Sequence, residues 1–168
     1  MDRAVTAGER PAVIALGSNL GDRRAAMTFA VRRLSRILSN LALSDIVETE
    51  PEGPSGELLE GEPLYLNAVV TGTTTLDGRA LLDELMAIEQ DFGRERPYPG
   101  AARTIDLDLI LLGDVVIDEP GLQVPHPRFR TRFFVLGPLA EVAPNLRDPV
   151  TGKSIGELLR ELLRDEAH

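Results

Sequence analysis

The 168-residue sequence contains no cysteine, and this absence excludes both a disulfide framework and catalysis by a thiolate. No apolar stretch approaches the roughly 20 residues that a membrane-spanning helix needs. The N-terminal residues 1–11 lack the hydrophobic segment of a secretory signal peptide. These absences lead us to expect a cytoplasmic protein that has no membrane partner.

Positive charge is also scarce, because 18 basic residues stand against 27 acidic ones and the formal net charge is −9. Such a chain lacks the positive field of a nucleic-acid binder, so we expect no nucleic-acid partner. An anionic ligand would need a local basic cluster. Every basic residue except Lys153 is arginine, whose planar guanidinium suits bidentate contacts to phosphate. For exposed helix positions, a genome-wide arginine bias is the better explanation.

Length and composition are those of one compact domain. We expect a flexible tail over residues 1–10 and a single domain over residues 11–168. Apolar periodicity predicts the order β-α-β-β-α-β, followed by a hairpin and C-terminal helices. This order favours an α+β fold of the ferredoxin-like, split βαβ type. The sheet would be mostly antiparallel, with helices on both faces in three αβα layers.

Local signals place these expected elements along the chain. The strands are expected at 13–16, 43–49, 65–73 and 103–112. Asp22 and Asp77 are suitable N-caps for the first two helices, and Asn40 marks the expected end of the first. Gly113 and Asp114 indicate a hairpin turn. Further helices are expected over residues 132–142 and from residue 155.

The most informative feature is the pair Asp106 and Asp108, which lies within an alternating apolar run. Residues i and i+2 of a strand point to the same side, so both carboxylates would project from one face. Ile105, Leu107 and Leu109 would face a core. Adjacent like charges repel, and a divalent cation would relieve that repulsion. An amphipathic strand with solvated acids is the alternative.

Arginines flank this acidic strand on both sides in the sequence. Three precede it and three follow the hairpin: Arg94, Arg96, Arg103, Arg128, Arg130 and Arg132. Phosphoryl transfer requires this mixture, because carboxylates hold Mg²⁺ and cations neutralise the charge on the transferring group. Surface salt bridges between mixed charges are the alternative.

Tyr65 and Asn67 share one face of the third expected strand, next to the long Pro/Gly-rich segment 51–63. A ring beside an amide suits a flat heterocycle with mixed donor and acceptor edges. A core tyrosine with a buried, hydrogen-bonded amide would fit as well. His126, between two prolines, is either a phosphate contact or a loop histidine. The Gly17-Ser18 turn lacks the Lys-Ser/Thr ending of a Walker A loop.

Four sequence strings resemble one enzyme family: Ala15-Leu16-Gly17-Ser18-Asn19-Leu20-Gly21, Tyr65-Leu66-Asn67-Ala68, Arg103-Thr104-Ile105-Asp106-Leu107-Asp108-Leu109 and Val124-Pro125-His126-Pro127. Their order and spacing are similar to those of 6-hydroxymethyl-7,8-dihydropterin pyrophosphokinase of folate biosynthesis. The resemblance covers roughly residues 12–150. It implies transfer of a pyrophosphoryl group from ATP to the pterin's hydroxymethyl oxygen, which leaves AMP.

The resemblance also implies a metal site and a nucleotide site. Asp106 and Asp108 would bind two Mg²⁺ ions along the triphosphate, and Asp106 would help to orient or deprotonate the attacking hydroxyl. The remaining implied positions all serve ATP. Arg94 and Arg96 would be mobile-loop arginines, and the phosphate or nucleotide contacts would be Arg103, His126, Arg132, Glu89 and Leu109.

For the pterin, the resemblance implies that Tyr65 and Phe134 sandwich the ring, while Asn67 and the main chain of Thr49 read its edge. Two departures from the family concern the loops. Many members carry Trp-Gly-Pro where Gly100-Ala101-Ala102 stands here. The loop over residues 50–63 is longer and more acidic than usual. These departures affect how the loops would cover the pterin more than they affect the chemistry.

Two other function classes fit parts of the same pattern. One is another Mg²⁺-dependent nucleotidyl- or phosphotransferase on a ferredoxin-like sheet. The other is a non-catalytic, ligand-binding regulatory domain, a common use of this architecture. A regulatory domain has no need of paired carboxylates beside arginines. We therefore expect the pyrophosphokinase activity, with ATP and the pterin as partners, in a monomer.

Overall fold

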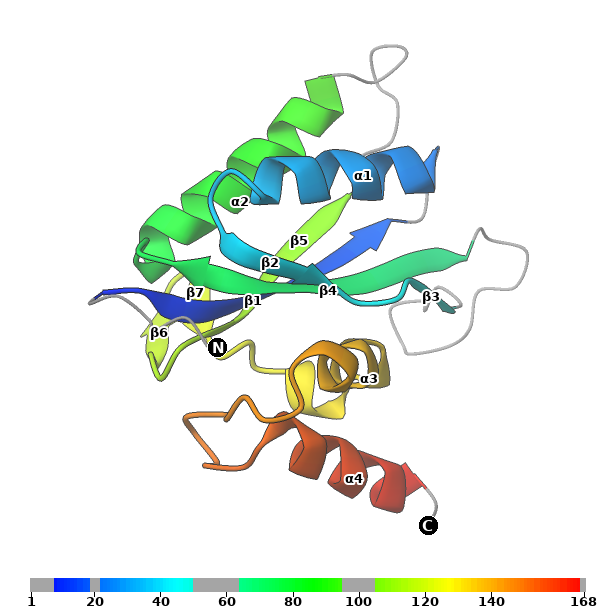
Figure 1. The fold of residues 1–168 in the computed structure, drawn as a ribbon, viewed down its shortest axis with the longest axis vertical. Coiled ribbons are helices and arrows are strands. Elements are labelled where there is room, and N and C mark those ends of the chain that lie inside the picture. Colours follow the sequence, from blue (N-terminus) through cyan, green and yellow to red (C-terminus); the bar gives the residue numbers. More distant parts are fainter. Residues whose placement is uncertain (1–7, 19–21, 50–63, 95–104, 167–168) are drawn as a thin grey trace.

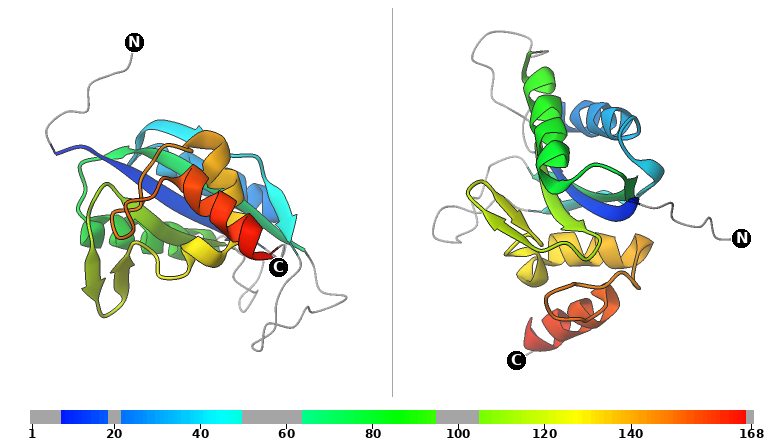
Figure 2. Two further views of the ribbon diagram at one scale, coloured as in Figure 1. Left: turned by 90° about the horizontal axis from the view of Figure 1, so that it is seen from below. Right: turned by 90° about the vertical axis from the view of Figure 1, so that its left-hand side faces the viewer.

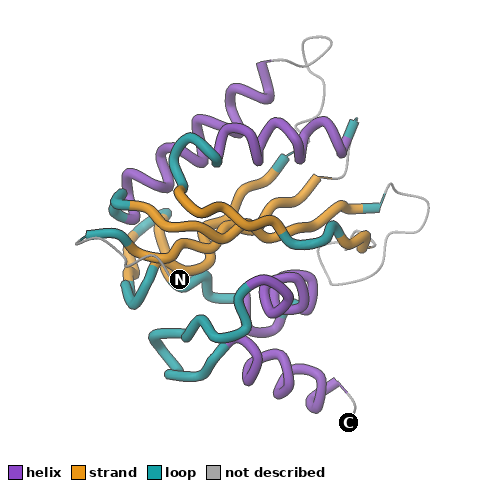
Figure 3. Tube along the Cα trace, in the orientation of Figure 1, coloured by secondary structure: helices purple, strands orange, loops and turns teal. Residues whose placement is uncertain are grey.

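An antiparallel sheet lies between two layers of helices in the computed structural model of this chain (Figure 1). The structure describes residues 8–18, 22–49, 64–94 and 105–166. Figure 3 shows the strands as a central layer with helices above and below it. The prediction of an α+β fold with a mostly antiparallel sheet and helices on both faces is therefore confirmed.

The sheet has the strand order β2-β4-β1-β5, and each neighbouring pair is antiparallel. The short strand β3 also pairs with β4. The five strands are β1 (Arg10–Ser18), β2 (Ser39–Leu43), β3 (Val47–Thr49), β4 (Tyr65–Thr74) and β5 (Asp106–Leu112). The central pair β1 and β4 is longest, so it forms the platform on which both helical layers pack.

Two helices cover one face of the sheet: α1 (Arg23–Leu34) and α2 (Gly78–Arg94). Both start at the predicted caps. The Asp22 carboxylate accepts from the backbone N of Ala25 at 3.0 Å, and that of Asp77 accepts from the backbone N of Ala80 at 2.8 Å. These bonds satisfy N–H groups that a helix leaves unpaired in its first turn. Leu81, Leu85 and Ile88 of α2 are buried in this layer's core.

The opposite face carries the 3₁₀ turn η1 (Phe129–Thr131), α3 (Phe133–Val142) and α4 (Ile155–Glu166). Side chains of α3 and α4 pack with Val13, Val69 and Ile110 in a second core. The views in Figure 2 show α4 lying against α3 rather than directly on the sheet. A small hairpin of β6 (Ile117–Glu119) and β7 (Leu122–Val124) lies beside β5.

A β-bulge between Val13 and Ile14 changes which side chains of β5 face each core. Leu107 and Leu109 face the α1/α2 core, as alternation predicts, but Ile110 and Leu111 both belong to the α3/α4 core. A bulge adds an unpaired residue and so reverses the alternation beyond it. The two aspartates precede the bulge, so both project from the α3 face.

Several expected boundaries were wrong. The helix that was expected to reach Asn40 ends at Leu34, where Leu38 donates its N–H to Leu34 O at 2.9 Å and closes a turn. Leu38 still enters the core, but from the turn. Asn40 lies in β2 with φ of 55°, a region that asparagine tolerates better than most residues. The apolar residues keep a helical spacing beyond Leu34 because the turn packs against the same core as the helix.

Other corrections concern the strands. Of the strand expected over 43–49, only Leu43 belongs to β2 and Val47–Thr49 form β3, because residues 44–46 are not strand. The hairpin lies at β6 and β7 and turns at Gly121, not at Gly113. The strand β1 begins at Arg10, the last residue of the expected tail, and residues 1–7 lie outside the described part. No helix within the described ranges combines the length and apolarity that a membrane span requires.

Candidate active site

A cavity of about 870 Å³ opens where the sheet meets the start of α3. One row of paired residues crosses four strands beneath it: Val47 of β3, Asn67 of β4, Gly17 of β1 and Asp106 of β5. Because residues paired across neighbouring strands point to the same face, this row forms the floor. The next row, Val69, Ala15 and Asp108, lies nearer the packed core.

The side chains of β1 become smaller toward the cavity. Val13 is fully buried in the α3/α4 core, Ala15 lies at its edge, and Gly17 lies beneath the open space. A Cβ atom on Gly17 would lie 3.6 Å from Asn67 Oδ1 and 4.0 Å from Tyr65 Cδ1. Those are ordinary contact distances, so the backbone has no need of glycine here. Its absent side chain leaves the floor flat.

Tyr65 and Asn67 both line the cavity, as their shared strand face predicted. The Asn67 amide donates from Nδ2 to Thr49 Oγ1 at 2.7 Å, which fixes the orientation of this side chain. Thr49 pairs with Tyr65 across β3 and β4, so it reaches the same wall. Burial and the negative charge of Asp106 raise the pKa of Tyr65. The phenol therefore stays protonated and able to donate a hydrogen bond.

Asp106 and Asp108 project from β5 into the cavity, and both are exposed. Asp108 also lines a second depression of about 600 Å³ on the far side of β5. His126 is shared by the same two hollows. Asp108 and His126 therefore lie where the aromatic cavity adjoins the second depression. A molecule bound in the cavity and a molecule bound in the depression could come into contact at this point.

His126 is held in a defined orientation beside Asp108. Its backbone N–H donates to Ile110 O at 2.9 Å, and its Nδ1 accepts from the backbone N of Arg128 at 3.1 Å. Burial lowers the pKa of His126, and Arg132 and Arg128 lower it further while Asp108 opposes them. A neutral ring that accepts at Nδ1 carries its proton on Nε2. His126 can therefore donate a hydrogen bond to an anionic ligand.

Arg132 and Phe134 lie together at the start of α3, on the cavity wall. The Arg132 guanidinium carbon is 5.6 Å from the centroid of the Phe134 ring, a cation–π distance. Arg132 also serves as the N-cap residue of α3, and its carbonyl accepts from the N–H groups of Val135 and Leu136. The helix start thus brings one cation and one aromatic face to the same opening.

Glu89 and Leu109 do not line the cavity. Glu89 Oε2 accepts from the backbone N of Leu107 at 2.7 Å, so it links α2 to β5 between the two aspartates. Leu109 is 6 % exposed, belongs to the α1/α2 core, and lines the second depression. Their expected roles beside the nucleotide stay predictions.

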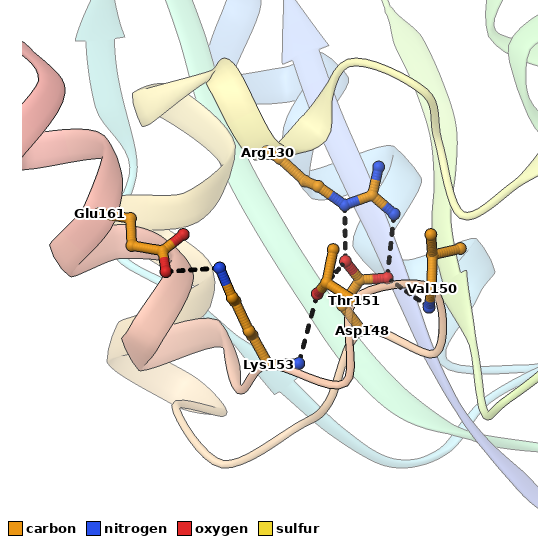
Figure 4. A network of polar contacts seen from close by, with 6 residues as sticks. All are labelled: Arg130, Asp148, Val150, Thr151, Lys153 and Glu161. Atoms are coloured by element: carbon orange, nitrogen blue, oxygen red, sulfur yellow. Dashed lines mark hydrogen bonds and ion pairs between the residues drawn. The ribbon is translucent and has the colours of Figure 1, made fainter.

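The six predicted arginines are not all placed at the cavity, and Arg128 is exposed and lines neither hollow. Arg96, Arg103 and the side chain of Arg94 lie outside the described residues. Arg132 lines the cavity. Arg130 does not, because its guanidinium holds the buried Asp148 carboxylate at 2.5 and 2.9 Å (Figure 4). The interpretation of Arg130 as part of a phosphate-binding cluster was therefore wrong. Sequence spacing alone could not locate a partner 18 residues away.

The two aspartates fit a magnesium site shared with a ligand. Mg²⁺ bound to phosphates commonly uses one or two carboxylates and leaves other positions to water and phosphate oxygens. Within the described ranges, no group of three or more His, Cys, Asp or Glu side chains is placed to hold a metal. The donor set thus suits a metal that arrives with a polyphosphate.

Several residues that line the cavity were not predicted as site residues, among them Gly17, which was considered only as part of a turn, and Phe133. Phe133 lines the cavity and is 49 % exposed. The available signal was the pair of consecutive phenylalanines at the start of a helix. With both included, an open aromatic cavity with paired carboxylates at its edge is typical of an enzyme that binds a small ring-shaped substrate.

Comparison with known proteins identifies the family. Residues 13–144 match the family model described as 7,8-dihydro-6-hydroxymethylpterin-pyrophosphokinase. A 2-amino-4-hydroxy-6-hydroxymethyldihydropteridine pyrophosphokinase of Pseudomonas aeruginosa is 39% identical over 148 residues, which is 87% of this chain and 88% of that protein. A protein of the same name from Synechocystis sp. is 38% identical over 90% of this chain and 75% of its own.

Solved structures share the fold at much lower identity. Crystal structures of HPPK-DHPS, one of them the wild-type protein of Plasmodium falciparum, superpose with TM-scores of 0.72 and 0.73 at 14% identity. They cover 93% and 94% of this chain, which spans only 45% and 44% of their length. The chain belongs to the 7,8-dihydro-6-hydroxymethylpterin-pyrophosphokinase family, so the predicted assignment to these folate-biosynthesis enzymes is confirmed.

Proposed function

We propose that this chain transfers the pyrophosphoryl group of ATP, with Mg²⁺, to the hydroxymethyl group of 6-hydroxymethyl-7,8-dihydropterin. The hydroxymethyl oxygen would form a bond to the β-phosphorus, and the bond from that phosphorus to the α,β-bridging oxygen would break. AMP would leave, and the hydroxyl proton would pass to a base or to water. The observation that carries the proposal is the aromatic cavity lined by Asp106 and Asp108, of which Asp108 also lines the second depression.

The pterin would occupy the cavity above Gly17. Tyr65 and Phe134, which both line it, would lie against the two faces of the ring. Asn67 would read the ring's polar edge, with its amide oriented by the bond to Thr49. The Thr49 main chain would complete this edge. Asn67 is only 7 % exposed. It would discriminate strongly against rings without a matching polar edge, because such a ligand would leave the buried amide without a hydrogen-bond partner.

The nucleotide would extend from the carboxylates into the second depression. Asp106 and Asp108 would hold two Mg²⁺ ions, which supply charge neutralisation along the triphosphate when bound. Asp106, the nearer to Tyr65, would also orient the attacking hydroxyl. His126 and Arg132 would contact phosphate oxygens. Leu109 would lie beside the adenine, with Glu89 on the same side.

The loop arginines complete the proposal. Arg94, at the end of α2, and Arg96 and Arg103, in the segment that follows α2, would contact the triphosphate and cover the reacting phosphates. Catalysis would then come mainly from positioning and charge neutralisation. Departure of the loops from the family pattern would alter how the site closes, not which bonds form.

We also propose the finer structural assignments. The strand order β2-β4-β1-β5, with α1 after β1 and α2 after β4, supports a ferredoxin-like split βαβ sheet. Both hydrophobic cores include residues of β1, β4 and β5, and this shared sheet supports one domain over residues 11–168. We further propose that the chain acts as a cytoplasmic monomer without a nucleic-acid partner, on the grounds of its charge and composition.

One assay separates this function from its alternative. Purified protein with ATP, Mg²⁺ and the hydroxymethylpterin should form AMP and the pterin diphosphate in equal amounts. A nucleotidyltransferase would release pyrophosphate instead. Formation of AMP without any dependence on the pterin, or no nucleotide turnover at all, would contradict the proposal.

A further inference from the structure

Three phenylalanines line the cavity, and they differ in exposure. Phe129 is fully buried and Phe134 is half-buried, whereas Phe133 is 49 % exposed. Phe133 is the first residue of α3 and lines the cavity with Arg132 and Phe134, its neighbours in the chain. A single exposed apolar side chain is common on protein surfaces. Phe133 differs from such residues because it also lines the cavity.

The Phe133 ring is seated on Gly137. A Cβ atom built on Gly137 would lie 3.2 Å from Phe133 Cζ, 3.3 Å from Cε1 and 3.6 Å from Cε2. Because three atoms of the ring's outer half approach that one point, the ring lies over the glycine. Residues four apart share a face of a helix, so a larger side chain at 137 would occupy the space of the ring.

Pro138 follows Gly137 within α3 and accounts for part of the need for glycine, because the proline ring crowds the Cβ atom of the preceding residue. The glycines with positive φ within the described ranges are Gly8, Gly113, Gly121 and Gly152, and Gly137 is not among them. Glycine inside a helix is unfavourable relative to alanine. The contact with Phe133 provides a second reason, since the ring would have to shift by a few tenths of an ångström to admit a Cβ atom at position 137.

We propose that Phe133, seated on Gly137, is a specificity-determining residue that forms the outer aromatic wall of the pterin site. This inference rests on the proposed function, in which the cavity holds the pterin. Ring binding would bury the exposed half of Phe133 and remove water from the mouth of the cavity. Phe133 would thus add to the stacking by Tyr65 and Phe134. It does not line the second depression, so ATP binding would be independent of it.

The test is a mutant cycle on the full chain, with steady-state kinetics and direct titration of the hydroxymethylpterin. Phe133→Ala should raise the KM and Kd for the pterin about tenfold, with the KM for ATP unchanged. Phe133→Leu should lie between wild type and Phe133→Ala. Gly137→Leu should displace the ring and match Phe133→Ala, while Gly137→Ala should have a smaller effect. In the Phe133→Ala background, Gly137→Leu should add nothing.

Controls separate this role from a structural one. Leu163→Ala removes another half-exposed apolar side chain, from α4, and Gly156→Ala adds a Cβ atom to α4 at ordinary contact distances. Both should leave the pterin KM unchanged. The melting temperature of each variant is measured beside its kinetics, so that a higher pterin KM at an unchanged melting temperature does not reflect unfolding.

The possible failures are distinguishable. If wild-type protein binds no pterin, the proposed function and this inference both fail. If wild-type protein binds the pterin and Phe133→Ala binds it equally well, only this inference is overturned. A further rise in the pterin KM on adding Gly137→Leu to Phe133→Ala would also overturn it, because Gly137 would then act other than through the ring.

Discussion

The two faces of the central sheet are built from the same strands, yet they differ in how completely they are packed. The α1/α2 face is covered along its length by buried apolar residues from β1, β4 and β5. The α3/α4 face is packed only over the half that includes Val13, Val69 and Ile110. Its other half, at Gly17 and Asn67, opens into the cavity. The difference shows how one sheet can supply stability on one face and a binding site on the other.

The open half is held in place by polar contacts from outside the sheet. Arg130 of η1 forms an ion pair with Asp148. The Asp148 carboxylate also accepts hydrogen bonds from the Thr151 hydroxyl at 2.7 Å and the Val150 N–H at 3.0 Å (Figure 4). Asp148 is fully buried. The turn η1 lies between His126 and Arg132, so this network fixes the chain segment that carries both to the cavity.

The largest expected effect is on catalysis at the open half. Asp106→Asn should lower kcat by about 10²- to 10³-fold or more, because a charged ligand at the reacting phosphates is removed. The melting temperature should stay near that of wild type, since Asp106 is exposed. Asp114→Asn, an exposed acid in the turn after β5, is the matched control and should retain activity. Normal turnover in Asp106→Asn would refute the site assignment.

A change in the packed face should have the opposite signature. Leu85 of α2 is fully buried, and Leu85→Ala should lower the free energy of unfolding by about 2–5 kcal/mol through lost burial and a cavity. The KM values for both substrates should change little at a temperature where the variant is folded. Urea denaturation and kinetics on the same preparation would check this. A selective loss of pterin affinity would show that the two faces are coupled.

The contact between Arg130 and Asp148 should give an intermediate loss of stability. Asp148→Asn should lower the free energy of unfolding by about 2–3 kcal/mol at pH 7, because a buried ion pair loses one partner. Lys153→Gln, which breaks an exposed pair with Glu161, should cost no more than about 1 kcal/mol. Equal losses in the two variants would contradict the importance of burial.

This network also predicts a pH dependence. Burial alone would raise the pKa of Asp148, but hydrogen bonds from Arg130, Thr151 and Val150 and the Arg130 charge bring it below its usual value. The stabilisation is therefore complete above the unfolded-state pKa of about 3.9 and is lost as pH falls through the lower native pKa. The stability difference between wild type and Asp148→Asn should shrink below about pH 4. A constant difference down to pH 2 would contradict it.

The smallest expected effect comes from closing the open half of the sheet. Gly17→Val would place a side chain on the cavity floor beside Asn67 and Tyr65. The Kd for the pterin should rise about 10- to 100-fold, while Gly17→Ala, whose Cβ meets only ordinary contacts, should have a smaller effect. Titration of pterin into each variant measures this. Unchanged affinity in Gly17→Val would place the ring elsewhere.

Much of the site followed from local patterns in the chain. Strict alternation placed Leu107 and Leu109 in the core and both aspartates on the opposite face, and the same reasoning placed Tyr65 with Asn67. The caps Asp22 and Asp77 were also correct. These features depend on neighbours within a few residues, so periodicity and capping chemistry are sufficient to predict them.

Features that depend on distant partners were not predictable in this way. The end of α1 at Leu34 was missed because the following turn continues the same apolar spacing. Arg130 was grouped with phosphate ligands because nothing near it in the sequence indicated Asp148 as its partner. The seat of Phe133 on Gly137 needed the helix and the cavity together.

The sequence alone determined that Asp106 and Asp108 would project from one face of a strand. It also determined that the ring of Tyr65 and the amide of Asn67 would project from one face of another strand. Both results follow because the side chains of a strand alternate between its two faces in any surroundings. The register of the sheet decided which residues of neighbouring strands lie opposite each other. It placed Gly17 between Asn67 and Asp106. Register depends on the packing of both faces at once. Only the folded chain could therefore bring the acids, the amide and the rings of α3 around one cavity.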